Sequence, residues 1–278
     1  MELSSSVGKG LPRVDALMKA TGKAIYSTDM ELSNMLNGSI LGSIYPHARI
    51  MRIDTSRAER LYGVKAVITA KDAPAVIWGF MLKDQPLLAR EKVRFIGEPI
   101  AAVAAIDKET ASEALDLIEV EYDELPPLFD PETAINSDAV RIHDEVDSYV
   151  TIWPLIRYGN VSSHVRIKRG DIERGFEESD FLFEDRFTTP MQHHGYMEPH
   201  AATAYVDPTG KVTVYTTTQA PFMVRLELAE TLELPLNKIR VVTTEVGGGF
   251  GGKTDILVEP LAALLARKAS LPVKIVLT

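Results

Sequence analysis

A cluster of glycines constrains the fold of this chain more than any other feature of its sequence. Five of the six positions from Gly247 to Gly252 are glycine, and only Phe250 interrupts them. Glycine loses more conformational freedom on folding than other residues, so such a cluster is expected where the backbone adopts positive φ or approaches a ligand closely. The apolar run at residues 239–246 predicts a strand directly before it. We therefore expect a tight, ligand-facing loop at the end of a strand.

The loop matches two nucleotide-binding patterns. Residues 247–254 fit the phosphate loop G-x-x-x-x-G-K-[ST], and Gly247, Gly249 and Gly252 fit the dinucleotide pattern G-x-G-x-x-G. A phosphate loop also needs an acidic residue on a later strand, and a dinucleotide fold needs a ribose-binding acid about 20 residues further on. Neither partner is found after Thr254. A nucleotide-binding protein and a simple packing turn are kept as alternatives.

The apolar pattern predicts a mixed α/β fold. A strand at 98–106, a helix that begins after Asp107 and a strand at 118–122 form one α/β unit, to which residues 64–70 add a strand. Four prolines and a loss of periodicity then mark a connecting segment. We divide the chain into a first domain at 1–130, a connecting segment at 131–160 and a second domain at 161–278.

The second domain is expected to combine strands and helices around the glycine loop. The turn at 207–210 predicts a hairpin of residues 201–206 and 211–218, and a closing strand is expected at 272–278. A helix from Pro221 to about Glu233 is expected to bury Phe222, Leu226, Ala229 and Leu232. A further strand is expected where three phenylalanines alternate with other residues, at Phe181, Phe183 and Phe187.

Composition excludes several classes of function. The net charge of -9 disfavours nucleic acid and anionic membranes as partners. No run of about 18 apolar residues could span a bilayer, and the first residues lack a signal-peptide pattern, so a cytoplasmic protein is expected. The sequence contains no cysteine, which excludes disulfides, iron–sulfur clusters and thiolate zinc sites held by this chain.

Several motifs, in order, resemble the molybdenum-binding subunit of the xanthine dehydrogenase and aldehyde oxidase family. In the second domain these are "MQHHGYMEPHAATAYV", "TTTQAP" and "GGGFGGK". In the first domain, "GSILGSIYPHARIMRIDTS" and "VRFIGEPIAAVAAIDKETASEALDLIEVEYDELPPLFDPETAI" are similar to the α/β hammerhead domain of that family. The resemblance covers essentially the whole chain and implies a hammerhead domain followed by the first part of a molybdopterin-binding α/β domain.

The resemblance also implies a cofactor and the residues that contact it. The cofactor is molybdopterin, with or without a cytosine dinucleotide extension, and its metal takes no ligand from the protein. Gln219 matches the catalytic glutamine beside the metal, and it is also a cofactor-binding residue. The other cofactor-binding positions are Gly248, Gly249, Phe250, Gly251 and Gly252. Iron–sulfur clusters and FAD are expected on partner subunits.

The activity implied is a molybdenum-dependent oxidoreductase. It would hydroxylate an aldehyde, N-heterocycle or aromatic substrate with oxygen from water, or carry out a reductive dehydroxylation. The family's glutamate base lies beyond the residues matched here, so a carboxy-terminal half or subunit is an expected partner and the chain is a fragment or a split subunit. A non-catalytic assembly or scaffold component is the alternative.

Thr254 marks a departure from the purine-oxidising members, which carry a glutamate at this substrate-side position. A purine substrate is therefore not expected, and the sequence resembles more closely the hydroxybenzoyl-CoA reductase, nicotinate dehydrogenase and aldehyde oxidase branches.

The cluster His193, His194, Glu198 and His200 could form a metal site, but Pro199 breaks helical spacing. We expect packing and hydrogen bonding there and no metal.

Overall fold

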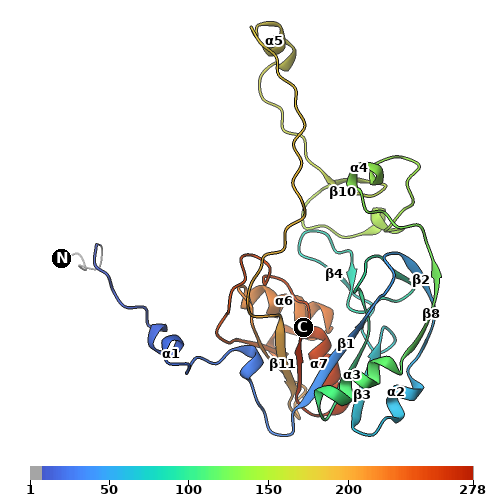
Figure 1. Cartoon of the computed structure of the whole chain (residues 1–278), viewed down its shortest axis with the longest axis vertical. Helices are drawn as coiled ribbons and strands as arrows, with labels where there is room; N and C mark the ends of the chain where they lie inside the picture. Colours follow the sequence, from blue (N-terminus) through green and yellow to red (C-terminus); the bar gives the residue numbers. More distant parts are fainter. Residues whose placement is uncertain (1–7, 278) are drawn as a thin grey trace.

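The centre of the structure is a mixed seven-stranded sheet (Figure 1). It is seen in a computed structural model that describes residues 8–277. The order of the strands across the sheet is β13-β12-β11-β14-β1-β7-β3. In chain order these strands are β1 (Leu36–Gly42), β3 (Val64–Thr69), β7 (Pro99–Ala105), β11 (Ala201–Val206), β12 (Val212–Thr216), β13 (Ile239–Thr243) and β14 (Val273–Val276). The mixed α/β fold expected from the sequence is confirmed.

The pairing of β1 with β14 joins the two predicted domains in this sheet. The two strands are parallel, with Leu36 opposite Val273 and Gly38 opposite Ile275. A Cβ atom at Gly38 would lie 2.6 Å from Cγ1 of Ile275, so this close approach requires glycine. β1, β7 and β3 come from the first half of the chain, and the other four strands come from the second half. The division into three sequence segments stays a prediction.

Both faces of the sheet are covered around β7, which explains its continuous apolar sequence. Ala102 and Ala104 belong to the core beneath helix α7 (Glu259–Ala269), whereas Ala101 and Val103 face a second core on the opposite side. That side is covered by α2 (Ser56–Arg60) and α3 (Lys108–Asp116). The side chain of Asp107 accepts a hydrogen bond from the N–H of Thr110 at 2.7 Å, so the predicted helix start is confirmed.

The remaining strands of the described residues form smaller sheets. A three-stranded sheet has the order β6-β2-β8, and two-stranded sheets pair β4 with β5 and β9 with β10. These strands are β2 (Ala48–Asp54), β4 (Ile77–Trp78), β5 (Gln85–Pro86), β6 (Lys92–Val93), β8 (Glu119–Glu124), β9 (Ile156–Tyr158) and β10 (Val161–His164). The other helices are α1 (Ala16–Ala20), α4 (Pro131–Ala134), α5 (Ile172–Glu177), α6 (Pro221–Thr231) and the 3-10 turns η1 (Ser27–Asp29), η2 (Val146–Ser148) and η3 (Leu236–Lys238).

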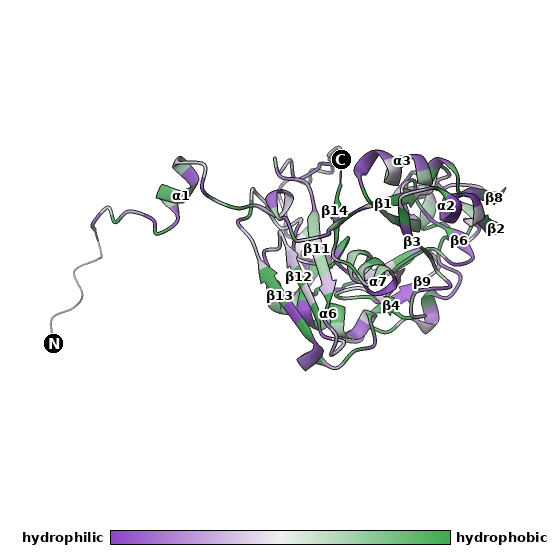
Figure 2. Cartoon of the chain, turned by 90° about the horizontal axis from the view of Figure 1, so that it is seen from below, coloured by the Kyte–Doolittle hydropathy of each residue, from purple (hydrophilic) through white to green (hydrophobic). Residues whose placement is uncertain are grey.

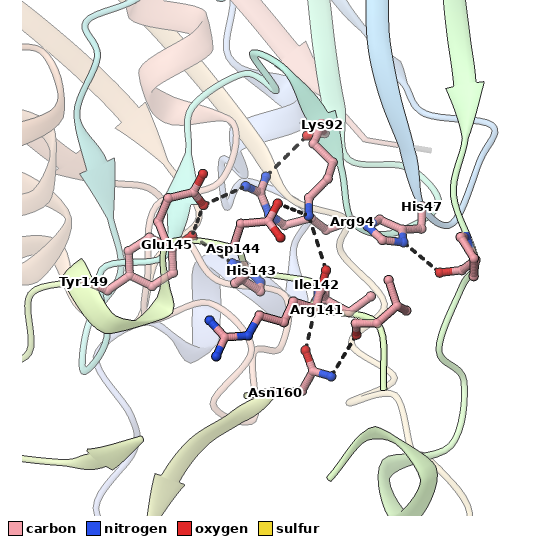
Figure 3. A network of polar contacts seen from close by, with 12 residues as sticks. His47, Lys92, Arg94, Arg141, Ile142, His143, Asp144, Glu145, Tyr149 and Asn160 are labelled. Carbon is pink, nitrogen blue, oxygen red and sulfur yellow. Dashed lines mark hydrogen bonds and ion pairs between the residues drawn. The ribbon is translucent and has the colours of Figure 1, made fainter. Parts of the chain in front are cut away.

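Polar contacts hold the connecting segment against the first domain (Figure 3). Lys92 Nζ donates to Asp144 Oδ2 at 2.7 Å. Within the first domain, His47 Nδ1 lies 2.7 Å from the carbonyl oxygen of Pro126. Within the segment, Asn160 Oδ1 accepts from the N–H of Ile142 at 2.9 Å. Burial and the nearby cations Arg94 and Lys92 lower the pKa of His143 to about 4. This histidine is therefore neutral at physiological pH.

Helix α6 buries a different face from the one expected. Its buried side chains are Val224, Glu227, Leu228 and Thr231, which recur at helical spacing. Leu232 is buried as predicted, but Phe222 and Leu226 are exposed, so those two assignments are wrong. The buried face includes a glutamate and a threonine, and their polarity concealed it in the apolar pattern.

A long excursion, here called the arm, comprises residues 165–195. Every one of these residues is exposed, and α5 lies at the tip, far from the sheet in Figure 1. The strand predicted around Phe181, Phe183 and Phe187 is absent among the described residues, because this segment has no neighbouring strand to pair with. The segment that carries α1 also extends away from the body in both Figure 1 and Figure 2. Throughout residues 8–277, we find no helix with the length and apolar character needed to cross a membrane.

Candidate functional site

The glycine loop follows β13 and has a backbone conformation that explains its composition. Gly248 and Gly251 have φ values of 101° and 90°. Phe250 also lies in the left-handed region, at φ 50°, where residues with a side chain are uncommon, and it is 71% exposed. A bulky residue in this conformation costs about 1–3 kcal/mol, and such residues cluster at ligand sites.

Close packing explains the other glycines of the loop. A Cβ atom at Gly249 would collide with the carboxamide of Gln219, and one at Gly247 would collide with Cβ of Glu198. Gly252 lies against Tyr196 and His194, where a Cβ atom would approach within 2.9 and 3.0 Å of ring atoms. The loop is thus fitted against two neighbouring segments, residues 194–198 and residues 217–219.

Gln219 holds the loop through one end of its amide group. Its Oε1 accepts hydrogen bonds from the N–H groups of Gly251 at 3.0 Å and Lys253 at 3.4 Å. Its own backbone N–H donates to the carbonyl oxygen of Lys253 at 2.8 Å. The residue is exposed, and the Nε2 donor takes no part in these contacts. No hydrogen bond joins that donor to the described residues around the loop.

Three successive amides at the apex of the loop also lack acceptors. The N–H groups of Gly248, Gly249 and Phe250 make no hydrogen bond to any part of residues 8–277. Gly249 is buried, and a buried amide without a partner is rare in folded proteins. Adjacent unpaired amides in a strained turn form a concavity that binds anionic or partially negative oxygens. The loop therefore fits a ligand rich in oxo or phosphate groups.

A buried ion pair fixes the loop from below. Lys253 is fully buried, and its Nζ donates to the carbonyl oxygen of Glu198 at 2.8 Å, to Glu198 Oε2 at 3.1 Å and to Thr217 Oγ1 at 3.1 Å. The ammonium group also lies 4.8 Å from the centre of the Tyr196 ring. Glu198 Oε2 accepts the N–H of Gly247 at 2.7 Å and the hydroxyl of Thr217 at 2.6 Å. One carboxylate oxygen thus connects the lysine to the first residue of the loop.

This geometry overturns the phosphate-loop interpretation. The lysine of a phosphate loop must reach the phosphates of its nucleotide. Lys253 points into the protein instead and is neutralised by Glu198. Thr254, whose hydroxyl would bind magnesium in that motif, donates to the carbonyl oxygen of Gly251 at 3.3 Å.

Two further glutamates, Glu259 and Glu227, accept hydrogen bonds from the backbone that follows the loop. Glu259 Oε1 accepts the hydroxyl of Thr216 at 2.6 Å, and its Oε2 accepts the N–H of Leu257 at 2.7 Å. Glu227 Oε2 accepts the N–H of Ile256 at 3.0 Å, while its Oε1 is buried without a partner in the described chain. Burial, reinforced by the charges of Asp255, Glu259 and Glu230, raises the pKa of Glu227 to about 7.

The loop lies open at the surface of the described residues. Cavities of about 660, 450 and 470 Å³ lie around the connecting segment and the first domain, and residues 247–252 line none of them. The largest is bounded by Lys92, Arg94 and Asp144, the residues of the polar network in Figure 3. Phe250, Gly251 and Gln219 are exposed together instead.

The structure thus brings together the site residues expected from the sequence: Gln219, Gly248, Gly249, Phe250, Gly251, Gly252 and Thr254. Their roles toward a ligand stay predictions. Sequence reasoning did not connect Glu198, Thr217 and Lys253, whose mutual contacts are here called the lock, and it assigned no role to Glu227. The available signals in the sequence were Lys253, directly after the glycines, and Glu198, directly before Pro199. No local pattern connects two residues so far apart in the chain.

Two family models match the chain. The description "Aldehyde oxidase and xanthine dehydrogenase, a/b hammerhead domain" covers residues 21–126, and "Molybdopterin cofactor-binding domain" covers residues 157–278. The glycine loop, Gln219 and the buried lock all lie in the second match. The resemblance inferred from the sequence is confirmed.

Known proteins are similar over nearly the whole chain. A probable xanthine dehydrogenase component of Bacillus subtilis is 41% identical over 95% of this chain and 34% of its own length. The nicotinate dehydrogenase large molybdopterin subunit of Eubacterium barkeri is 36% identical over 97% of this chain and 61% of its own length. The solved quinoline 2-oxidoreductase of Pseudomonas putida superposes with a TM-score of 0.86 at 32% identity, over 98% of this chain and 34% of its own. The chain therefore spans between a third and two thirds of the length of these proteins.

Replacing Lys253 by methionine should destabilise the protein. The substitution leaves Glu198 as a buried carboxylate without its counter-charge, a change that costs about 3–5 kcal/mol in other proteins. Urea unfolding followed by tryptophan fluorescence measures the change. Lys65→Met, at an exposed position, serves as the control and should stay within about 0.5 kcal/mol of the parent. Adding Glu198→Gln to Lys253→Met should recover part of the loss, and equal stability of Lys253→Met and the parent would show that the ion pair does not hold the loop.

Glu227 should make the protein less stable as the pH rises. Its pKa of about 7 in the folded state lies above the ordinary value of 4.5, so the folded state holds the proton more tightly than the unfolded state. Its contribution is complete below pH 4.5 and is lost as the pH rises through 7. Glu227→Gln keeps an acceptor for Ile256 and should raise stability at pH 8 by about 1–3 kcal/mol, with little effect at about pH 5. Unfolding curves of the variant and the parent at both pH values check this. A stability difference between variant and parent that is the same at the two pH values would contradict it.

Proposed function

We propose that this chain, which belongs to the xanthine dehydrogenase and aldehyde oxidase family, forms one wall of a molybdopterin site in a molybdenum-dependent oxidoreductase. The observation that carries the proposal is the apex of the glycine loop. There, the N–H groups of Gly248, Gly249 and Phe250 have no acceptor among the described residues, and the Nε2 of Gln219 takes no part in the bonds that hold the loop, in the segment that matches the molybdopterin cofactor-binding domain.

The residues present fit such a cofactor. A molybdopterin carries a phosphate, and its metal carries oxo-type oxygens, both of which accept hydrogen bonds. The N–H groups of Gly248, Gly249 and Phe250 would donate to these oxygens, and Gln219 Nε2 would donate beside them. Side chains at Gly247, Gly249 or Gly252 would displace the residues that support the loop. Metal ligation by this chain is not part of the proposal.

When bound, the cofactor supplies two-electron redox chemistry. The chain itself supplies orientation. The bonds from the loop to Gln219 Oε1 fix the orientation of the carboxamide. Its Nε2 donor would therefore need little reorganisation to stabilise negative charge that develops near the metal. Lys253 and Glu198 keep the loop rigid from below, and Phe250 adds an apolar ring at the open face.

The proposed molybdopterin site would need residues from further polypeptide to be complete. The relatives extend well beyond the part that this chain matches, and we infer that the general base and the remaining cofactor contacts come from that carboxy-terminal part. Subunits that carry iron–sulfur clusters and FAD would pass on the electrons, because a chain without cysteine cannot hold an iron–sulfur cluster through its own thiolates. A cytosine dinucleotide form of the cofactor, a cytoplasmic location, and oxidation of an aldehyde or N-heterocycle are parts of the same proposal.

Analysis of the native complex tests this function. The chain is tagged in its own host, and the purified complex is assayed for molybdenum, for oxidised pterin fluorescence and for dye-linked oxidation of aldehydes and N-heterocycles. Stoichiometric molybdenum and pterin with turnover are expected. A complex with cofactor but without turnover would favour an assembly role, and a complex without either would overturn the proposal.

Gln219→Ala should lower turnover more than cofactor content. The substitution removes both the acceptor for Gly251 and the free donor, and loss of one such donor costs about 100–1000-fold in turnover in a hydrolase. Gln219→Glu separates the two roles, because it keeps an acceptor for the loop but loses the donor. We expect Gln219→Glu to retain molybdenum and still lose activity. Full turnover in the metallated Gln219→Glu enzyme would remove this residue from the chemistry.

Xanthine should be a poor substrate. Thr254 bonds the loop carbonyl of Gly251 and offers no carboxylate to a purine, and a site built to hydrogen-bond a substrate discriminates strongly when one partner is missing. Turnover of xanthine is expected to be at least about 100-fold below that of nicotinate or an aromatic aldehyde in the same preparation. Comparable rates would show that Thr254 does not determine specificity, whatever the names of the relatives indicate.

A further inference from the structure

The arm has a definite shape that its own contacts do not explain. All of residues 165–195 are exposed, including the large side chains of Phe181, Phe183, Phe187 and Met191. An ion pair joins Arg186 of the arm to Glu132 at α4, and both side chains are mostly exposed. A cluster of large exposed apolar side chains marks an interaction site.

The backbone of the returning leg, residues 181–191, is also without partners. The N–H groups of residues 181–185 and 187–189 make no hydrogen bond to any described residue, and the N–H of Arg186 reaches only the adjacent Asp185 side chain. An extended segment with free N–H and C=O groups is ready to pair with the edge of a sheet. Pro190 lacks an N–H, so the pairing would run from residue 181 to residue 189.

The side chains of this leg alternate as they do in a half-buried strand. Successive side chains of a strand point to opposite faces, which places Phe181, Phe183 and Phe187 on one face. The opposite face carries Leu182, Glu184 and Arg186. The face with the three phenylalanines carries one charged side chain, Asp185, whereas the opposite face carries two, Glu184 and Arg186. The phenylalanine face is therefore the one that would be buried.

A similar solved structure contains further polypeptide beside the part that this chain matches. The quinoline 2-oxidoreductase superposes on 98% of this chain, which leaves out about six residues, fewer than the arm contains. Most of the arm is therefore aligned with residues of that protein, and this chain covers only 34% of that protein's length. A long segment that makes so few contacts of its own keeps such a shape when other polypeptide holds it.

We propose that residues 181–189 form a strand at the edge of a sheet in the polypeptide that makes up the rest of the relatives' length, with Phe181, Phe183 and Phe187 buried against it. The inference rests on the proposed function, because it names the surface through which the carboxy-terminal part is held. The arm belongs to the segment that matches the molybdopterin cofactor-binding domain.

Hydrogen exchange in the native complex tests the pairing. The complex is purified from its host through a tag on this chain, and amide exchange of residues 181–189 is compared with that in the chain alone. We expect strong protection of alternate amides in the complex and fast exchange in the free chain. Phe183→Asp and Leu182→Asp provide a matched pair, since both replace an exposed apolar residue of the same leg by the same acid.

Phe183→Asp should lower the affinity for the carboxy-terminal part by about tenfold or more, whereas Leu182→Asp should leave it within about threefold. Equal effects of the two variants, or fast exchange of residues 181–189 in the complex, would overturn the proposal. So would protection of the arm in a self-associated form of the chain alone, measured by light scattering. Molybdenum and pterin are assayed in parallel. A complex held by the arm but free of cofactor would contradict the proposed function only, and a loaded complex with an exposed arm would contradict this inference only.

Discussion

The parallel pairing of β1 with β14 is the constraint on which the rest of the structure depends. It places β14 between β1 and β11, so that the strands of both halves form one sheet. Helix α7 connects the glycine loop to β14 and is buried over most of its length. The carboxy-terminal end of the loop is therefore anchored in the main core. Movement of the loop as a whole would require the core beneath α7 to move as well.

The lock beneath the loop shows how a flexible composition gives a rigid site. Five glycines by themselves would leave a mobile segment, but Glu198 holds Gly247 at one end and Gln219 holds Gly251 at the other, next to the buried Lys253. The buried charges compensate each other, and hydrogen bonds from Thr217 and Gly247 satisfy Glu198 Oε2. Because these contacts do not involve a ligand, the donors at the apex are arranged before any ligand arrives.

Local physics made much of the fold predictable, and non-local contacts set the limit. The Asp107 cap, the turn at 207–210 and the apolar run of β7 act over a few residues, and the structure has each of them. The prediction of a strand at residues 181–187 was wrong. Alternation of apolar and polar side chains indicates a tendency to pair, whereas pairing needs a neighbouring strand, and the described residues offer none to this segment. The pairing of β1 with β14 and the contact between Lys253 and Glu198 join residues far apart in the sequence, so no local pattern could reveal them. The face of α6 was misjudged because Glu227 and Thr231 occupy buried positions.

The close approach of Gly249 to Gln219 has a consequence for how this site can change during evolution. The carboxamide fills the space that a Cβ atom at position 249 would need. A larger residue at position 249 would force that carboxamide to move and to give up its bond to Gly251. The two positions are thus coupled energetically, so the effect of a substitution at one of them depends on the residue at the other.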